Sequence, residues 1–220
     1  MVLHENTTGV YQEAIVKMEL FSYKVARDYG FAPNPFGKYC TLATCKPGIR
    51  KHAVVGDWVI GTGTRKYKNE NSLIYAMKVD EKISFNQYWH DQRFQYKKPI
   101  FNGSLKQAFG DNIYYFDKNA WHQSNSHHSN ADGTTNFHNL NRDTQSDFVL
   151  ISETFYYFGE FSIRIPNNWQ NDICVKYQGY KKYIPKTISN NFIDWIISTF
   201  HIGIHAAPKL FTTFERYKGY

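Results

Sequence analysis

Hydrophobic and polar positions along the chain predict several short strands and one helix near the C-terminal end. Residues Leu20–Ala26 alternate large apolar side chains with smaller or polar ones, which is typical of a strand that buries one face. Residues 58–61 and 73–79 are short apolar runs, so each is expected to form a strand. Between Ile188 and Phe200 apolar residues recur at helical spacing, and Gly203 is a suitable stop for that helix.

Local start signals add further elements. Ser84 and Gln87 fit a capping box, which predicts a helix from residue 85 to about residue 96. Pro47 suits the first turn of a short helix, because a helix leaves its first N–H groups unpaired in any case. The apolar run 148–158 predicts one more strand. Together these elements indicate an α+β protein.

Residues 97–146 are mostly polar and rich in turn residues, with an apolar patch at 113–116. A loop of this length is usually functional or disordered. Trp121 and the histidines in this segment favour an ordered, functional loop, because disordered segments are poor in aromatic residues. Since 220 residues suit one sizeable core, we expect a single domain over residues 1–220, with residues 1–18 as an N-terminal extension.

Composition and charge indicate an anionic partner. The chain has 26 Lys and Arg against 19 Asp and Glu, a formal charge of +7, and 18% aromatic residues. This balance favours nucleic acid or a nucleotide as the partner. No apolar stretch approaches the roughly 20 residues of a membrane span, so no membrane partner is expected. Three cysteines without zinc-type spacing, and no cationic leader into an apolar run, predict a cytoplasmic protein.

The stretch 27–63 is the first candidate site. Pro33 and Pro35 restrict the backbone on either side of Asn34, so this loop is preorganised and loses little entropy on binding. A Val-Gly-Asp turn then leads into the strand that starts at Trp58. The stretch offers stacking rings and groups that can hydrogen-bond a base edge. A structural turn with Trp58 in the core explains the same residues, and both interpretations stay open.

The second candidate site lies between residues 110 and 145. A histidine oriented by a carboxylate can act as a general acid or base at neutral pH. The residues expected to do this are Asp111, His127, His128 and Asp143. Loop histidines with hydrogen-bonding roles are the alternative. His122, His127 and His128 could also offer imidazoles to zinc, but no HExxH pattern is present, so neither a metal nor a cofactor is predicted.

Several well-known cofactor and catalytic motifs are missing. The Gly-Thr-Gly run at 61–63 would need a third glycine where Lys66 stands to form a dinucleotide fingerprint, and no GxxxxGK[ST] loop occurs. No GxSxG nucleophile elbow is present either. Cys40 and Cys45 are interpreted as small buried residues, and a reactive thiol beside Lys46 is the alternative.

A series of sequence blocks resembles a known family. The blocks RDYGFAPNPF, CTLATCKPGIR, VGDWVIGTG and GDNIY are followed by Trp121-x-Gln123, Ser126-x-His128-Ser129, Asp143-Thr144 and VLISxxFxYFG. Their order is similar to that of the second nucleotide-modification-associated domain family. The resemblance implies a bacterial or phage domain associated with systems that make, read or restrict modified DNA bases. The glycine-rich GRGHK-like block of the family is degraded here at residues 179–182.

The order of elements is also similar to that of PUA-like domains of the EVE, ASCH and YTH kind. This resemblance implies an α+β fold with a mixed β-barrel, flanking helices and a C-terminal helix. Such domains hold a flipped nucleobase in an aromatic cage, with a basic rim against the phosphates, and stacking combined with edge hydrogen bonds is a sound way to read a base. Trp58, the proline loop and Trp121 would then converge on one pocket.

Two functions follow from these observations. In the first, the domain binds a nucleobase or nucleotide, as a modified or flipped DNA base, in a phage or bacterial DNA-modification or defence context. The residues expected to contact this ligand are Arg27, Asp28, Asn34, Phe36, Tyr39, Lys46, Trp58, Thr62, Asn112, Tyr114, Trp121, Gln123 and Ser126. The cations expected at its phosphates are Arg27, Lys46, Arg50, Arg65 and Lys66. The alternative is an enzyme that transfers or hydrolyses a group on a modified nucleobase or nucleotide, using the Asp and His residues of 110–145.

Overall fold

The computed structural model describes residues 18–177 and 179–217, so residues 1–17 of the predicted N-terminal extension lie outside the described part. The α-helices are α1 (Pro47–His52), α2 (Phe85–His90), α3 (Leu105–Ala108), α4 (Phe137–Asp143), α5 (Asn167–Ile173) and α6 (Lys186–Thr199). Short 3-10 helices are η1 (Arg65–Tyr67), η2 (Gln92–Lys97) and η3 (Gly159–Phe161). The strands are β1 (Leu20–Lys24), β2 (Cys40–Leu42), β3 (Trp58–Thr62), β4 (Ser72–Lys78), β5 (Glu81–Ser84), β6 (Tyr114–Asp117), β7 (Ala120–Gln123), β8 (Phe148–Ser152), β9 (Phe155–Tyr157), β10 (Ile163–Arg164), β11 (Tyr180–Lys181) and β12 (Gly203–Ile204).

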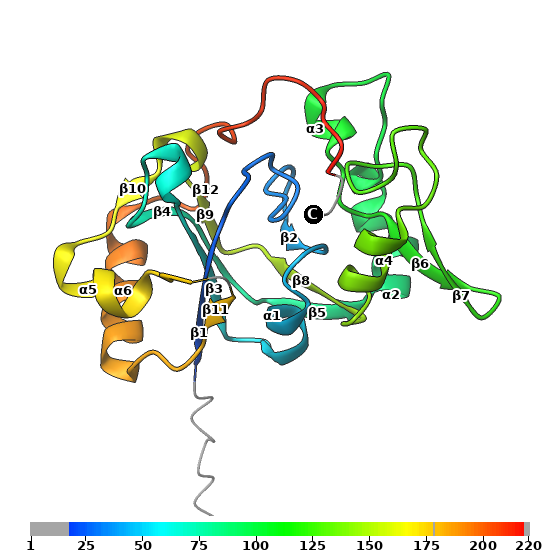
Figure 1. The fold of residues 1–220 in the computed structure, drawn as a ribbon. Helices are drawn as coiled ribbons and strands as arrows, with labels where there is room; N and C mark the ends of the chain where they lie inside the picture. The colour runs from blue at the N-terminus through cyan, green and yellow to red at the C-terminus, as the bar shows by residue number, and fades with distance from the viewer. Residues whose placement is uncertain (1–17, 178, 218–220) are drawn as a thin grey trace, which may run out of the picture.

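The largest sheet runs in the order β11-β1-β3-β4-β9-β12, and β10 pairs with β4. β1 pairs with β3 in parallel, as β12 does with β9. Helices α5 and α6 cover one face of this sheet (Figure 1), where Trp58 and Phe192 belong to one buried cluster. Residues of α1, β2 and β8 join Tyr23 and Tyr75 in a second cluster on the other face. Because both faces are covered, the prediction that the strand at Leu20 buries only one face is wrong.

A closed barrel is not formed by the described residues, which corrects the prediction of a mixed β-barrel, whereas the α+β class is confirmed. The run 148–158 forms two strands that belong to different sheets. β8 pairs with β2 and β5, and β9 pairs with β4 in the largest sheet. The carboxylate of Asp80 holds the turn between them, because it accepts hydrogen bonds from the N–H groups of Glu153 and Thr154 at 2.9 and 3.0 Å.

Residues 97–146 are more regular than the predicted long loop, because they contain α3, the β6–β7 hairpin and α4. A third buried cluster anchors them to α2 and η2. The capping box at Ser84 is confirmed, with its hydroxyl accepting from the Gln87 N–H at 3.2 Å. The helix ends at His90 rather than near residue 96, because Asp91 is extended and its carboxylate caps η2 at the Arg93 N–H.

The predicted C-terminal helix is confirmed as α6, although Gly203 lies in β12 beyond its end. Among residues 18–177 and 179–217, no helix has the length and apolar character that a membrane crossing needs. After β12 the chain runs back across the molecule to the region of α4 (Figure 1, red). There the Tyr217 N–H donates to the carbonyl oxygen of His127 at 2.6 Å. The C-terminal segment therefore packs on the loop that follows β7.

Candidate functional site

His128 and Asp143 form a buried hydrogen-bonded pair. His128 lies in the loop after β7, and Asp143 is the last residue of α4. His128 Nδ1 is 2.8 Å from Asp143 Oδ2, and neither side chain is more than 2% exposed. The sequence offered Asp111 or Asp143 as the carboxylate that orients a histidine. The structure places Asp143 at His128, whereas Asp111 bonds to the hydroxyl groups of Thr41 and Tyr88.

Asp143 is surrounded by further donors. The Tyr114 hydroxyl donates to Oδ2 at 2.9 Å, and the Cys45 backbone N–H donates to Oδ1 at 3.0 Å. Arg142 Nε lies 3.4 Å from Oδ1. Burial acts to raise the pKa of Asp143, but the positive charge of His128 and the hydrogen bond to it outweigh burial and lower the pKa to about 2. The group is therefore a carboxylate throughout the physiological range.

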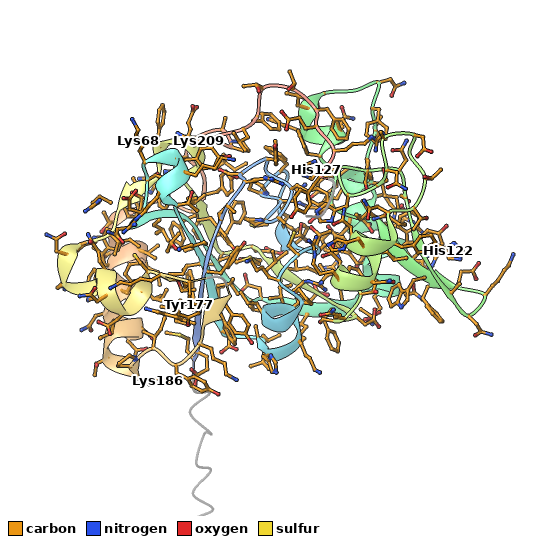
Figure 2. The ribbon with its side chains drawn as sticks, viewed as in Figure 1. Lys68, His122, His127, Tyr177, Lys186 and Lys209 are labelled. Atoms are coloured by element: carbon orange, nitrogen blue, oxygen red, sulfur yellow. The ribbon has the colours of Figure 1, made fainter. Side chains whose placement is uncertain are left out.

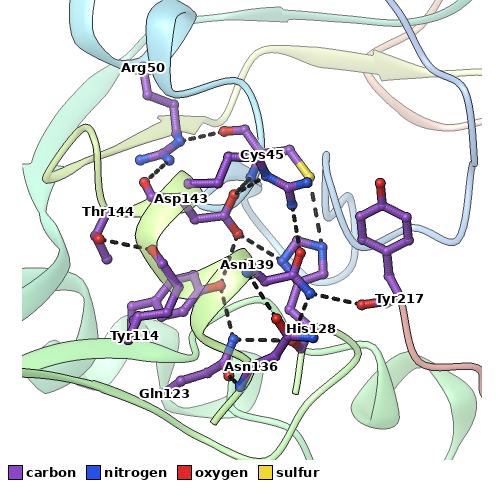
Figure 3. Close-up of polar contacts among 12 residues, drawn as sticks. Cys45, Arg50, Tyr114, Gln123, His128, Asn136, Asn139, Asp143, Thr144 and Tyr217 are labelled. Carbon is purple, nitrogen blue, oxygen red and sulfur yellow. Dashed lines mark hydrogen bonds and ion pairs between the residues drawn. The ribbon is translucent and has the colours of Figure 1, made fainter. Parts of the chain in front are cut away.

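His128 directs its other ring nitrogen at the thiol of Cys45 (Figure 3). The distance from His128 Nε2 to Cys45 Sγ is 3.9 Å. Burial acts to lower the pKa of His128, but the charge of Asp143, together with Cys45, outweighs burial and raises the pKa to about 9. His128 is therefore protonated at neutral pH. Cys45 is partly exposed, whereas Cys40 and Cys174 are buried.

A left-handed turn and a buried arginine position Cys45. Cys45 and Lys46, between β2 and α1, have φ angles of 56° and 40°. Arg50 is 0% exposed; it donates to the Cys45 carbonyl oxygen at 2.8 Å and to three carbonyl oxygens of residues 143–148. These bonds tie the Cys45 turn to the end of α4. The expectation that Arg50 contacts phosphate is wrong, because its guanidinium is enclosed in the protein.

Cys45, His128 and Asp143 also place three atoms of metal-ligand type within 4.8 Å of one another. Both carboxylate oxygens of Asp143 already accept hydrogen bonds from the protein. Only Cys45 Sγ and His128 Nε2 then remain available to coordinate a metal, whereas zinc sites use three or four protein ligands. The donor set therefore fits a hydrogen-bonded row of side chains better than a metal centre. His122 lies out on the β6–β7 hairpin, away from His127 (Figure 2).

A basic cleft lined by tyrosines lies beside the pair, with a volume of about 400 Å³. The residues that line it are mostly cationic or aromatic and include Arg27, Tyr29, Lys66, Tyr67, His127, Arg216 and Tyr217, with Glu215 as the acidic member. Tyr217 joins the cleft to the pair, because its ring centre is 5.5 Å from that of His128. The guanidinium of Arg27 lies 4.7 Å from the centre of the same ring. Anionic and flat chemical groups are therefore the ligands that suit this cleft.

Similarity to known proteins agrees with this setting. A family model described as nucleotide modification associated domain 2 matches residues 17–215. The chain belongs to this family. The resemblance inferred from the sequence blocks is thereby confirmed, and it places the protein in the context of DNA modification. Neither a curated protein nor a solved structure matches the chain.

In this member of the nucleotide modification associated domain 2 family, the three parts of the expected composite pocket do not converge. Trp58 is 4% exposed and packs on Tyr156, in the cluster under α5 and α6. Asn34 is 1% exposed, donates to the Phe109 carbonyl oxygen at 3.0 Å and belongs to another part of the fold. Trp121 packs edge-on against Phe85. The aromatic cage expected from these residues is therefore absent among the described residues.

Asn34 instead belongs to a buried polar network. Lys97 is 2% exposed, and its ammonium donates to Asn34 Oδ1 at 2.8 Å. Burial raises the pKa of Asp111 to about 6 and lowers the pKa of Lys97, while the opposite charges of the two groups counteract each shift. Such a network stabilises the proline loop from the protein interior, because each of its buried polar groups has hydrogen-bond partners. Side chains that satisfy one another in the interior do not face a ligand.

Most of the other residues named from the sequence are also enclosed. The buried ones are Asp28, Phe36, Tyr39, Thr62, Asn112, Tyr114, Gln123 and Ser126. Lys46 is partly buried and lies 4.7 Å over the Tyr23 ring. Arg27 and Lys66 are the predicted cations that line the cleft. Sequence reasoning missed Tyr29, Tyr67, Arg216 and Tyr217, because no motif links these distant segments, and it assigned Cys45 to the core.

Proposed function

We propose that the domain binds a nucleotide unit of DNA that carries a modified or flipped base, in the cleft between Arg27, Lys66 and Arg216. The binding belongs to a bacterial or phage DNA-modification or defence system and takes place in the cytoplasm. The observation that carries the proposal is the grouping of cations and tyrosine rings around one cleft beside His127. Membership of the nucleotide modification associated domain 2 family supports a nucleotide as the ligand.

The chemistry of the cleft suits the two parts of a nucleotide. Arg27 and Lys66 are exposed, so their charges are available to a phosphate. Tyr29 and Tyr67 are partly exposed, and stacking on such a ring contributes about 1 to 3 kcal/mol per base. The cleft volume of about 400 Å³ lies within the usual range of small-molecule sites, about 300 to 1,000 Å³. The proposal keeps the flipped-base capture of PUA-like domains without their closed barrel.

A titration tests the proposal and yields our first prediction. Short single-stranded DNA with and without a modified base, and free nucleotides, are titrated at about 50 and about 200 mM salt. Lys66→Ala is expected to weaken binding several-fold and to reduce the salt slope by about one, because one phosphate contact is lost. Lys51→Ala, at an exposed lysine of α1 outside the cleft, is the matched control and should bind as the wild type does. Absence of binding to every probe, or equal losses in both variants, would contradict the proposal.

The His128–Asp143 pair favours a second candidate, an enzyme that transfers or hydrolyses a group on a modified nucleobase or nucleotide. The two side chains have the mutual geometry of a general acid–base and its orienting carboxylate. Asp111 has no such role in this candidate, because it is enclosed in the network around Lys97. Replacing His128 with Ala and following modified nucleosides by mass spectrometry separates the two candidates. Unchanged turnover would exclude His128 as the acid–base group.

A further inference from the structure

Cys45 is a cysteine of a different kind from the other two. Its side chain is partly exposed, while Cys40 and Cys174 are enclosed in the core. Its Sγ lies 3.9 Å from His128 Nε2, and His128 Nδ1 lies 2.8 Å from Asp143 Oδ2. We propose that Cys45 is the nucleophile of an acyl-transfer site, with His128 as its acid–base partner and Asp143 as the positioning residue. This inference does not depend on what occupies the basic cleft.

The order of the three groups matches the requirements of nucleophilic catalysis. A nucleophile needs a base within reach, and the base needs a third group that fixes its orientation. The carboxylate of Asp143 is hydrogen-bonded to Nδ1 of His128, so the ring is held with Nε2 toward Cys45 Sγ. A distance of 3.9 Å is a loose contact that can tighten when a substrate arrives, as catalytic contacts often do. Figure 3 shows the three side chains, with His128 joined by dashed lines to both Cys45 and Asp143.

A cysteine that only filled space would not require this surrounding. Cys45 and Lys46 both adopt left-handed backbone conformations, which cost free energy in residues other than glycine and cluster at functional sites. The buried Arg50 serves to tie the Cys45 carbonyl oxygen to the end of α4. The Cys45 N–H is also fixed, because it donates to Asp143 at 3.0 Å. The Cys45 N–H is therefore held at the carboxylate that orients His128, and the Cys45 carbonyl oxygen is linked through Arg50 to the backbone carbonyl oxygen of Asp143.

Cationic side chains gather around Sγ. Burial acts to lower the pKa of His128, but Asp143 and Cys45 raise it to about 9. His128 therefore faces Sγ as a cation. Arg142 and Lys46 add positive charge near the thiol, and the Asp143 carboxylate, which has an oxygen within 4.8 Å of Sγ, is the negative group there. A thiolate paired with an imidazolium is the nucleophilic form of cysteine.

The proposed reaction is transfer of an acyl group from an ester or amide. The Cys45 thiolate attacks the carbonyl carbon and forms a C–S bond. The C–O or C–N bond then breaks, and His128 Nε2–H gives its proton to the leaving oxygen or nitrogen. The neutral imidazole next takes a proton from water, or from an acceptor hydroxyl or amine, as that group attacks the thioester. The thiolate leaves, so no oxidant or reductant is consumed.

The test uses the full-length protein and two probes, and it is our second prediction. With iodoacetamide at neutral pH, Cys45 is expected to alkylate at least about tenfold faster than glutathione, as peptide mapping resolves. With p-nitrophenyl acetate, a burst of about one equivalent of p-nitrophenolate and an acetyl group on the Cys45 peptide are expected. Cys45→Ser should abolish the burst, whereas Cys174→Ser, a matched change at a buried cysteine, should keep it.

A further variant separates catalysis from simple thiol exposure. His128→Asn, checked for folding by circular dichroism, is expected to slow acylation of Cys45 by about 100-fold or more while the thiol remains present. Alkylation of Cys45 no faster than that of glutathione, or acetylation on other residues alone, would overturn the proposal. So would a stoichiometric metal ion in the protein as isolated that shields Cys45 from iodoacetamide. If His128→Asn does not fold, the Cys45→Ser and Cys174→Ser pair still decides the question.

Discussion

The charge state of the His128–Asp143 pair makes the stability of the protein depend on pH at both ends of the scale. Burial acts to lower the pKa of the His128 imidazole, but Asp143 and Cys45 raise it from its ordinary 6.5 to about 9. The contribution of His128 to the free energy of unfolding is therefore complete below about pH 6.5 and is lost as the pH rises through about 9. Asp143 has its pKa lowered from 3.8 to about 2, so its contribution is complete above about pH 3.8 and is lost toward about pH 2.

A third prediction follows for Asp143→Asn. The change leaves a buried imidazole without its counter-charge, so we expect a loss of about 3 to 5 kcal/mol in the free energy of unfolding near neutral pH. The difference between wild type and variant should shrink as the pH rises above about 9, because His128 then loses its proton in the wild type as well. Urea unfolding at several pH values measures it. Asp117→Asn, at an exposed position of β6, is the control, and a difference independent of pH would contradict the account.

Residue types alone identified part of this site. His128 and Asp143 could be selected from the sequence, because a histidine near a carboxylate in a polar segment is a general acid–base candidate. The contact of Cys45 with His128 spans 83 positions of the chain, and no local pattern carries that information. Asn34 was singled out as a ligand contact because it is polar and sits between prolines. The sequence does not reveal that buried partners already satisfy its side chain.

At the scale of elements, local signals were sufficient wherever the chain itself supplies the start and stop of a structure. The capping box at Ser84, the proline that opens α1, and the helical spacing of α6 all predicted elements that the structure contains. The split of the run 148–158 could not be predicted, because Asp80, far away in sequence, holds the turn. α4 was missed because its short sequence is polar and lies in a turn-rich segment.

The fourth prediction concerns Arg50, which couples α1 to α4. Arg50→Met removes a buried guanidinium and leaves carbonyl oxygens of residues 143–148 without their donor. We expect the free energy of unfolding to fall by about 3 kcal/mol or more, because unpaired buried acceptors are costly. Lys51→Met, at the exposed neighbouring residue of the same helix, should change stability by about 0.5 kcal/mol at most. Chemical unfolding of the two variants measures this difference. Equal losses of unfolding free energy would show that Arg50 does not couple α1 to α4.

At the scale of the whole molecule, the path of the C-terminal segment decides what the site contains. This segment crosses back to the loop after β7, where the Arg216 guanidinium donates to the Ser126 carbonyl oxygen at 2.7 Å. It thereby adds a cation and the Tyr217 ring to a wall formed by Arg27 and Tyr29. The formal charge of +7 indicated an anionic partner, but only the fold shows which of the 26 basic residues gather around a cleft. Predicting which basic residues line the cleft requires the path of the chain in space, and the resemblance to PUA-like barrels did not describe that path.

A second hollow provides the competing location for a nucleotide. It has a volume of about 520 Å³ and is lined by residues that include Tyr177, Tyr180, Lys181, Lys182 and Tyr183. It also combines rings with lysines, but it contains neither His127 nor Tyr217, which connect the first cleft to the His128–Asp143 pair. A measurement that locates the bound base therefore discriminates between the two.

Photo-crosslinking is the most direct test of the central claim, and it is our fifth prediction. Single-stranded DNA in which 5-iododeoxyuridine replaces thymidine is irradiated with the full-length protein, and the crosslinked peptides are identified by mass spectrometry. Because a stacked base lies against the ring that holds it, crosslinks are expected at Tyr29, Tyr67 or Tyr217. Crosslinks confined to residues 177–183, or none at all, would contradict nucleotide binding in the cleft beside His127.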